Sequence, residues 1–437
     1  RGPGARVEVG ERSLVERGAR IDDEYVLPPF TFAARQRRSV VEVPAGRLDE
    51  LSSDVERLGR ALEAAGGPSV SASAAGLETA RELHAALVDG AGRLAVSCGP
   101  FGEGVEITAV APAAAAGPHL AVAADIGTTT VVAMLVDLER GTVLGRASRY
   151  NEQIRRADDV AARISYCRTA DDLREMQRLV VDDTLNQLID EICRAAGAEP
   201  ARIVRAAVAG NTVMMHLLLG LPPAGIGAIP FCPVVRRHPE YRARDIGLRA
   251  HPNAVLDVVP SLSGHVGGDL TADACAARLL DRPGVTLLVD IGTNGEILLW
   301  DGRTLRCAAT AAGPAFEGAG LRHGMRAADG AVDHIRWSAD LTPEWTVIGG
   351  GPAAGFCGSA IIDFVAQSLR AGVLDLLGRF DLDRLRGAGL HVRAEHRGRH
   401  THACRIVPAE ARVTHPTLTL SEADVAEVLK AKTAIHA

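Results

Sequence analysis

Apolar residues along the chain alternate between the period of helices and the period of strands. Helical spacing predicts helices within 49–67 and 77–90, the first ending at a pair of glycines. Runs rich in β-branched residues predict strands at 68–73, 93–99 and 104–112. Residues 46–111 are therefore expected to form a small αβ module.

The pattern differs on either side of this module. Residues 1–45 are rich in Arg, Glu and Gly with little apolar period, which predicts a linker or a loosely packed arm. The small residues of 111–119 predict a hinge. From His119 onward, strands are expected to alternate with helices, including a long helix over 171–197. This alternation is typical of an α/β fold with a mainly parallel sheet.

Two stretches of the chain are near copies, 165 residues apart: VAADIGTTTVVAML (122–135) and LLVDIGTNGEILLW (287–300). In each, a strand is expected to deliver an aspartate, Asp125 or Asp290, to a glycine turn that leads into a second strand. Glycine lets backbone N–H groups approach an anion, threonine adds a hydroxyl donor, and aspartate can hold magnesium through water. The duplication favours two phosphate-binding turns closing on one nucleotide over two unrelated structural hairpins.

The composition narrows the function classes. The 437 residues are 47% hydrophobic and 23% charged, which is typical of a soluble globular protein of several domains. The net charge of −6 gives no electrostatic reason to expect nucleic acid or an acidic membrane as a partner. No apolar run is long enough to span a bilayer, and eight cysteines occur singly, which favours a cytoplasmic protein with reduced thiols.

Asp-Ile-Gly-Thr-Thr followed by a strand resembles the first phosphate loop of the sugar kinase, heat-shock ATPase and actin (ASKHA) superfamily, and DIGTNGE resembles its second loop. The resemblance implies two ribonuclease-H-like halves with a nucleotide cleft between them, preceded here by the small αβ module. The ATPase domain would cover 119–437, with halves of roughly 119–280 and 281–437.

The same resemblance implies the roles of individual residues. ATP phosphates would be bound by Gly127, Thr128, Thr129, Thr130, Gly292, Thr293 and Asn294. Asp125 and Asp290 would hold Mg²⁺ and take part in catalysis. GHVGGDLTADACAARLLD (264–281) is similar to the Gly-Gly-Asp element of carbohydrate kinases, whose aspartate is the catalytic base; that residue is Asp269 here. The structural alternative is that Asp269 is only a helix N-cap.

Four further motifs narrow the family. They are RASRYNEQIRRADDVAARISYC (146–167), AVAGNTVMMHLLLG (207–220), ATAAGPAFEGAGLRHGMRAADGAVDHI (309–335) and GGGPAAGFCGSAIIDFVAQSLRAG (349–372). Together with the two loops they resemble the reductive activators of corrinoid-dependent methyltransferases. This resemblance implies an ATPase that drives single-electron reduction of Co(II) to Co(I), a corrinoid protein or corrinoid methyltransferase as its partner, and a homodimer.

The sequence departs from that family in three places. The family begins with a ferredoxin-like [2Fe–2S] domain, whose four-cysteine set this chain does not contain, and we expect that domain to precede Arg1. The family also continues past the helix that ends this chain to a glycine-rich turn for the adenosine, so this segment alone is expected to bind nucleotide poorly. Glu152 stands where the family usually has proline between Asn151 and Gln153.

Several polar residues near these motifs have two interpretations each. Glu296 is a second base or a solvated side chain on the outgoing strand. Asn211 bridges the two halves or caps the next helix. His216 is expected to be packed rather than catalytic, and Cys357 to be a small packed residue rather than a redox ligand.

Two rival functions stay open at the level of sequence. A carbohydrate-type small-molecule kinase would explain the pairing of Gly-Gly-Asp with DIGTNG, although the low aromatic content of 3% disfavours a sugar pocket. A non-catalytic docking fragment would bind a corrinoid partner without binding nucleotide.

Overall fold

The computed structural model describes residues 32–70, 75–292, 294–310, 313, 315, 320–325, 327–397, 400–408 and 417–436. The chain divides between Pro283 and Gly284 into an N-terminal and a C-terminal unit.

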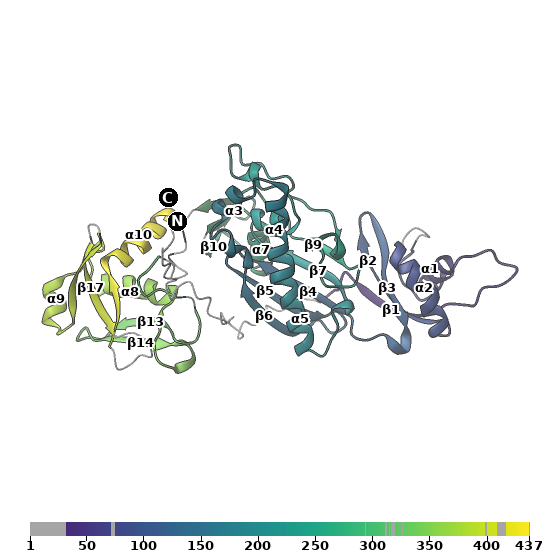
Figure 1. The fold of residues 1–437 in the computed structure, drawn as a ribbon, viewed down its shortest axis with the longest axis horizontal. Coiled ribbons are helices and arrows are strands. Elements are labelled where there is room, and N and C mark those ends of the chain that lie inside the picture. Colours follow the sequence, from purple (N-terminus) through teal and green to yellow (C-terminus); the bar gives the residue numbers. More distant parts are fainter. Residues whose placement is uncertain are drawn as a thin grey trace, which may run out of the picture. The chain divides into compact units, whose positions relative to one another are not determined.

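Helices and strands occur throughout both units (Figure 1). The N-terminal unit contains the strands β1 (Arg37–Glu42), β2 (Arg93–Phe101), β3 (Gly104–Pro112), β4 (Leu120–Ile126), β5 (Thr130–Asp137), β6 (Thr142–Tyr150), β7 (Ile203–Ala209), β8 (Tyr241–Arg242) and β9 (Val255–Val258). Its helices are α1 (Asp54–Ala64), α2 (Leu77–Asp89), α3 (Val160–Tyr166), α4 (Ala170–Val180), α5 (Asn186–Ala195), α6 (Thr212–Leu218) and α7 (Gly268–Ala276).

The C-terminal unit has its own sheets and helices. Its strands are β10 (Thr286–Ile291), β11 (Gly295–Trp300), β12 (Leu305–Thr310), β13 (Ala331–Trp337), β14 (Pro343–Val347), β15 (Gly355–Phe356), β16 (Val392–Arg397), β17 (His400–Val407) and β18 (Leu418–Ser421). Its helices are α8 (Gly358–Arg370), α9 (Leu382–Gly387) and α10 (Glu422–His436). The mixed α/β fold expected from the sequence is confirmed.

The small αβ module is a sheet of order β1-β2-β3 with α1 and α2. Ser53 begins α1 with a capping box, in which its hydroxyl accepts from the Glu56 amide and the Glu56 carboxylate accepts from the Ser53 amide. Both predicted helices are confirmed. The predicted arm 1–45 is wrong in part, because Arg37–Glu42 pair with β2 as an edge strand. Its first 31 residues, and 71–74 of the expected strand at 68–73, lie outside the described residues.

The central sheet has the order β6-β5-β4-β7-β9-β8. The expectation of a mainly parallel sheet is wrong: β4–β7 and β7–β9 are parallel, whereas β6–β5, β5–β4 and β9–β8 are antiparallel. The reason is the short turns between β4, β5 and β6, which force consecutive strands into hairpins. Helix α5 packs along β5 and β6 (Figure 1).

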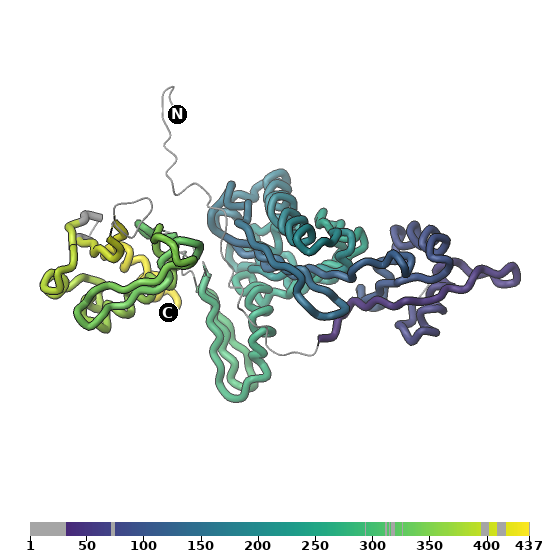
Figure 2. The backbone as a smooth tube through the Cα atoms, turned by 90° about the horizontal axis from the view of Figure 1, so that it is seen from below, coloured from purple at the N-terminus to yellow at the C-terminus, as the bar shows by residue number. Residues whose placement is uncertain are grey.

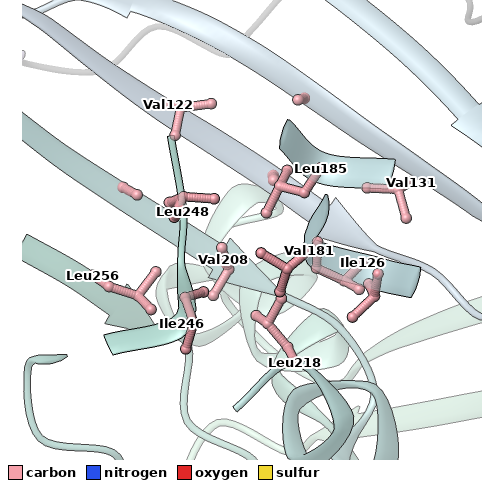
Figure 3. Packing of buried hydrophobic residues seen from close by; sticks show 14 of the residues in the cluster. Val122, Ile126, Val131, Val181, Leu185, Val208, Leu218, Ile246, Leu248 and Leu256 are labelled. Carbon is pink, nitrogen blue, oxygen red and sulfur yellow. The ribbon is translucent and has the colours of Figure 1, made fainter. Parts of the chain in front are cut away.

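A continuous apolar core lies between this sheet and its helices. Alternate residues of β4, including Val122 and Ile126, face inward with Val208 of β7 and Leu256 of β9 (Figure 3). The helix expected over 171–197 is interrupted at Val181–Leu185 by a π-helical turn, which also contributes Val181 and Leu185 to the core. Burial of these side chains is the main source of stability of the sheet.

Two buried arginines fix the small module to the central sheet. Arg205 on β7 pairs with Asp257 through two contacts of 2.5 and 2.7 Å, and its Nη1 donates to the carbonyl of Pro100 at 3.3 Å. Arg242 on β8 pairs with Glu106 and lies 3.7 Å above the ring of Phe101. The segment expected to be a hinge is also held, since Arg38 donates to the carbonyls of Ala116 and Gly117.

The C-terminal unit packs α8 and α10 around strands β13, β15, β17 and β18. Its buried core contains Val332, Phe356, Phe364, Leu420 and Val425. The strands β10, β11 and β12 form a separate antiparallel sheet, visible as an elongated green ribbon in Figure 2.

The two near-copy hairpins form as predicted, but their packing differs. Val122 and Ile126 of β4 are 2% and 0% exposed, whereas their counterparts in the second copy, Leu287 and Ile291 of β10, are 60% and 53% exposed. Within the described residues, the face that forms the core of the first copy is therefore uncovered in the second. The conserved pattern specifies a strand with one apolar face and does not specify what covers that face.

In the part of the chain that the structure describes, no helix is both long enough and apolar enough to cross a membrane.

The N-terminal unit is predicted to lose stability on mild acidification. Burial lowers the pKa of His119 to about 4, with a further contribution from Arg38, and lowers the pKa of His238 to about 4; burial also lowers the pKa of His216. An unfolded histidine titrates near 6.5, so the unfolded chain binds more protons between pH 6.5 and 4. Stability is therefore full above about pH 6.5 and falls as the pH drops toward 4, by up to about 3 kcal/mol for His119.

Amide hydrogen exchange resolved by peptide checks this expectation. Protection of β4, β7 and α6 should fall between pH 7 and 5 after correction for intrinsic exchange. His119→Gln, which cannot titrate, should weaken that dependence. An unchanged pH dependence in this variant would contradict the role of His119.

Candidate nucleotide site

Three segments of the N-terminal unit meet where the parallel strands β4, β7 and β9 end. The first Asp-Ile-Gly-Thr turn follows β4, Gly210 and Asn211 follow β7, and Gly267 precedes α7. The Gly268 amide donates to the Gly210 carbonyl at 2.9 Å, and Asn211 Nδ2 donates to Thr128 Oγ1 at 3.0 Å. In α/β sheets, ligands bind outside the carboxyl ends of parallel strands, so this is the expected place for a ligand site.

Glycines permit the close approach of these segments. A Cβ atom on Gly127 would lie 2.4 Å from the carbonyl oxygen of Thr130, and one on Gly267 would lie 2.4 Å from Cα of Asn211. Neither neighbour is a flexible side-chain end, so any larger residue would force the segments apart. The glycines thus form a narrow cradle of backbone, as phosphate-binding loops do.

The carbonyl groups of the first turn are held from the interior of the unit. Asn151 Nδ2 donates to the carbonyl of Gly127 at 2.9 Å, and the fully buried Arg163 donates through Nη2 to the carbonyl of Thr128 at 2.5 Å. A trans peptide points its C=O and N–H in opposite directions. The amides of Thr128 and Thr129 therefore point away from these two donors, and the turn is set to offer N–H groups to an anion.

The predicted side chains of the first turn lie beside this backbone. Asp125 is exposed near the end of β4, Thr128 is buried beneath Asn211, and Thr129 and Thr130 are partly exposed. Backbone amides, threonine hydroxyls and a carboxylate together suit a phosphate that carries a cation. In the described residues, no group of three or more His, Cys, Asp or Glu side chains is arranged to hold a metal ion.

Asp269 lies in the first turn of α7, and its amide donates to the Gly210 carbonyl at 3.3 Å. The N-cap of α7 is Gly267, so the interpretation of Asp269 as an N-cap is wrong. Its Oδ1 accepts from the Leu270 amide at 2.8 Å, which orients the half-buried carboxyl group. The structure thus brings Asp269, Asn211 and the first turn together.

The second turn has a different electrostatic setting. Asp290 lies directly opposite Glu296 in the β10–β11 pair, whereas Asp125 lies opposite Val132 in β4–β5. Glu296 is only 5% exposed, so its interpretation as a solvated side chain is wrong. Burial raises the pKa of Asp290, although a backbone hydrogen bond partly opposes this. In the turn itself the Gly292 amide donates to the Asn294 carbonyl at 3.0 Å, and Thr293 lies outside the described residues.

Three other polar residues have resolved roles. Asn211 caps α6, with Oδ1 accepting from the Met214 amide at 2.9 Å, in addition to its contact with the first turn. His216 is fully buried and packed as expected, between the carbonyl of Thr212 and the amide of Val234. Cys357 is also buried, at the start of α8.

The sequence did not reveal that Asn151 and Arg163 support the first turn. Arg163 Nη1 also donates to Gln153 Oε1 at 2.9 Å, so one buried network joins these residues. The available signal was an arginine on an otherwise apolar helix face, which spacing alone does not connect to a turn 35 positions earlier. Glu152, in place of the proline of related sequences, donates its amide to Thr184 Oγ1 in the π-helical turn at 3.1 Å, a bond that proline cannot make.

Comparison with known proteins places this arrangement in a family. Residues 120–282 match the model of the RACo middle region, and residues 284–437 match the C-terminal domain of RACo, the ASKHA domain. A solved structure named "Reductive activator for corrinoid,iron-sulfur protein" superimposes with a TM-score of 0.81 and 31% identity, covering 95% of this chain and 64% of that one. The chain is homologous to this activator.

Two curated relatives agree. The "Corrinoid activation enzyme RamQ" of Eubacterium limosum is 35% identical over 267 residues, which are 60% of this chain and 44% of RamQ. The "[Co(II) methylated amine-specific corrinoid protein] reductase" of Methanosarcina barkeri is 24% identical over 308 residues, covering 62% of this chain and 55% of that protein. The chain therefore spans about half the length of the curated relatives.

Asn211 is predicted to stabilise the site through two separable bonds. Asn211→Ala removes both the helix cap and the contact with Thr128, and should lower the free energy of unfolding by about 2 kcal/mol. Asn211→Ser keeps a capping oxygen and loses only the Thr128 contact, so its loss should be about 1 kcal/mol or less. Urea denaturation followed by circular dichroism measures both; equal losses would contradict a separate contribution from the Thr128 bond.

Asp290 is predicted to weaken the fold that carries it. Because burial raises the pKa of Asp290, its charged form is disfavoured in the folded unit at neutral pH. Asp290→Asn should therefore raise the melting temperature of the C-terminal unit. Tryptophan fluorescence reports this, since Trp300, Trp337 and Trp345 all lie in that unit. A lower melting temperature would show that the Asp290 charge stabilises the fold.

Proposed function

We propose that this segment is the ATP-binding part of a reductive activator that returns a corrinoid protein from Co(II) to Co(I). The observation that carries the proposal is the convergence of the first Asp-Ile-Gly-Thr turn, Gly210–Asn211 and Gly267–Asp269 at the ends of parallel strands. The names of the homologues, which are a corrinoid activation enzyme and a corrinoid protein reductase, support the choice of partner.

The residues of the first turn fit a nucleotide phosphate. The amides of Thr128 and Thr129 donate to phosphate oxygens, the glycine cradle excludes side chains, and Asp125 holds Mg²⁺ through water. Gly292, Thr293 and Asn294 supply a second set of phosphate ligands, and Asp290 with the opposing Glu296 provides negative charge for the same ion. A bound cation would offset the repulsion between these two carboxylates.

ATP, when bound, supplies the free energy for an otherwise unfavourable reduction. Asp269 orients the attacking water and holds its proton at a carboxylate that the Leu270 amide has already positioned. The reduction itself transfers one electron to Co(II) and gives Co(I). That electron comes from an iron–sulfur centre outside this segment, because the chain has no four-cysteine set of ferredoxin spacing.

Asp269→Asn is predicted to lower ATP-dependent formation of Co(I) by about 10²- to 10⁴-fold, because it removes a general base while leaving the phosphate ligands in place. The full-length protein is mixed with reductant, MgATP and a corrinoid protein in the Co(II) state, and Co(I) is followed by absorbance. The affinity for MgATP should change little.

Asp171→Asn, which replaces an exposed carboxylate on α4, is the matched control and should behave as wild type. Co(I) formation by wild-type protein without ATP would refute the proposal. ATP consumption stimulated by a sugar or polyol instead of a corrinoid protein would assign the site to a carbohydrate-type kinase.

A further inference from the structure

An exposed apolar loop lies next to the candidate site. Ile229 is 85% exposed, Val234 is 60% exposed and Phe231 is 41% exposed, all within residues 228–237. The neighbouring Leu262 is 38% exposed, and the ring of His265 packs edge-on against Phe231 at 4.8 Å between centroids. We call residues 228–237 with Leu262 and His265 the docking loop surface. Clustered apolar exposure of this kind marks an interaction site more often than isolated exposed residues do.

The docking loop surface is held in one conformation by polar contacts beneath it. The Val234 amide donates to Nε2 of the buried His216 at 3.0 Å. Arg236 Nη1 donates to the carbonyl of Leu262 at 2.9 Å, and the Ser261 amide donates to the carbonyl of Arg236 at 2.9 Å. A surface ordered before binding loses little conformational entropy when a partner docks.

The same contacts connect the surface to the residues of the candidate site. His216 lies on α6, which Asn211 caps, and Thr212 Oγ1 donates to the carbonyl of Ser263 at 2.7 Å. The segment from Ser261 to Val266 continues directly into Gly267 and Asp269. A partner on this surface would therefore contact the chain segments that carry Asn211 and Asp269.

The charge around the surface indicates the kind of partner. Arg236 and Arg237 are exposed, and the nearest following carboxylate, Glu240, is already paired with Arg35 at 3.4 Å. The rim is thus basic although the whole chain carries −6. A two-fold contact between copies of this chain would place these arginines against their own counterparts, which disfavours self-association.

We infer that the docking loop surface binds the corrinoid protein, through an apolar patch on that protein ringed by acidic side chains. This inference rests on the proposed function and adds to it where the partner contacts the chain. Docking there lets the partner sense the state of the nucleotide site through α6 and the start of α7.

Cys232 gives a direct measure of coverage, because its thiol is free and exposed in the centre of the loop. The wild-type protein is treated with N-ethylmaleimide, and each cysteine is quantified by peptide mass spectrometry. A methylated amine-specific corrinoid protein, or a corrinoid iron–sulfur protein, should slow modification of Cys232 at least about tenfold, and should leave the exposed Cys307 of β12 unchanged.

Two other results of this footprint would overturn the inference. Protection of Cys232 by MgATP without a corrinoid protein would mean that another part of the same chain covers the loop. Protection that grows with the concentration of this protein alone would mean that a second copy covers it.

A charge-introducing variant tests the surface by affinity. Ile229→Glu should raise the dissociation constant for the corrinoid protein at least about tenfold without changing the affinity for MgATP. Val88→Glu, at a 66% exposed position of α2, is the control and should bind as wild type. If wild-type protein binds the corrinoid protein and Ile229→Glu binds equally well, the docking inference is wrong and the proposed function stands. If wild-type protein neither binds nor reduces any corrinoid protein, the proposed function itself fails.

Discussion

The candidate site depends on a guanidinium group buried directly beneath the first turn. Arg163 has no exposed surface, and burial lowers its pKa to about 10, so it stays charged at neutral pH. Burying a charge costs several kcal/mol unless hydrogen bonds satisfy it. Arg163 meets that condition with the carbonyls of Thr128 and Ala157 and the side chain of Gln153. The energy spent on burial therefore fixes the direction of the turn, because its carbonyls can face only inward.

This constraint extends through the N-terminal unit. Gln153 and Asn151 follow β6 and connect through Glu152 to the π-helical turn at Thr184. On the other side, Asn211 joins the first turn to the cap of α6, and the Gly210 carbonyl joins it to α7. Because each link is a backbone group or a cap, the phosphate-facing amides are positioned by secondary structure rather than by flexible side chains. Such support is what a preorganised site requires.

Local patterns predicted the local elements well. The alternation around Asp125 and Asp290 predicted both hairpins, and helical spacing predicted α1 and α2. Strand β1 was missed because Arg37–Glu42 show little apolar alternation, and their partner β2 lies more than 50 positions away. The contacts of Arg163 and Asn151 with the first turn were missed for the same reason. Hydrophobic period encodes which face of an element is buried, whereas pairing over long separations depends on the assembled fold.

The near-copy hairpins show this limit most clearly, and also why duplication does not make equal halves. Thr130 and Gly295 occupy matching positions, yet Ile126 pairs with Val131 and Ile291 pairs with Gly295, so the second turn is one residue shorter. That shift places Glu296 opposite Asp290, where the first copy has Val132 opposite Asp125. One aspartate thus stands alone on an exposed strand end, and the other shares a partly buried position with a second carboxylate. Two such environments hold a cation with different strength and respond differently to its loss, so the two turns are expected to divide the work of binding unequally.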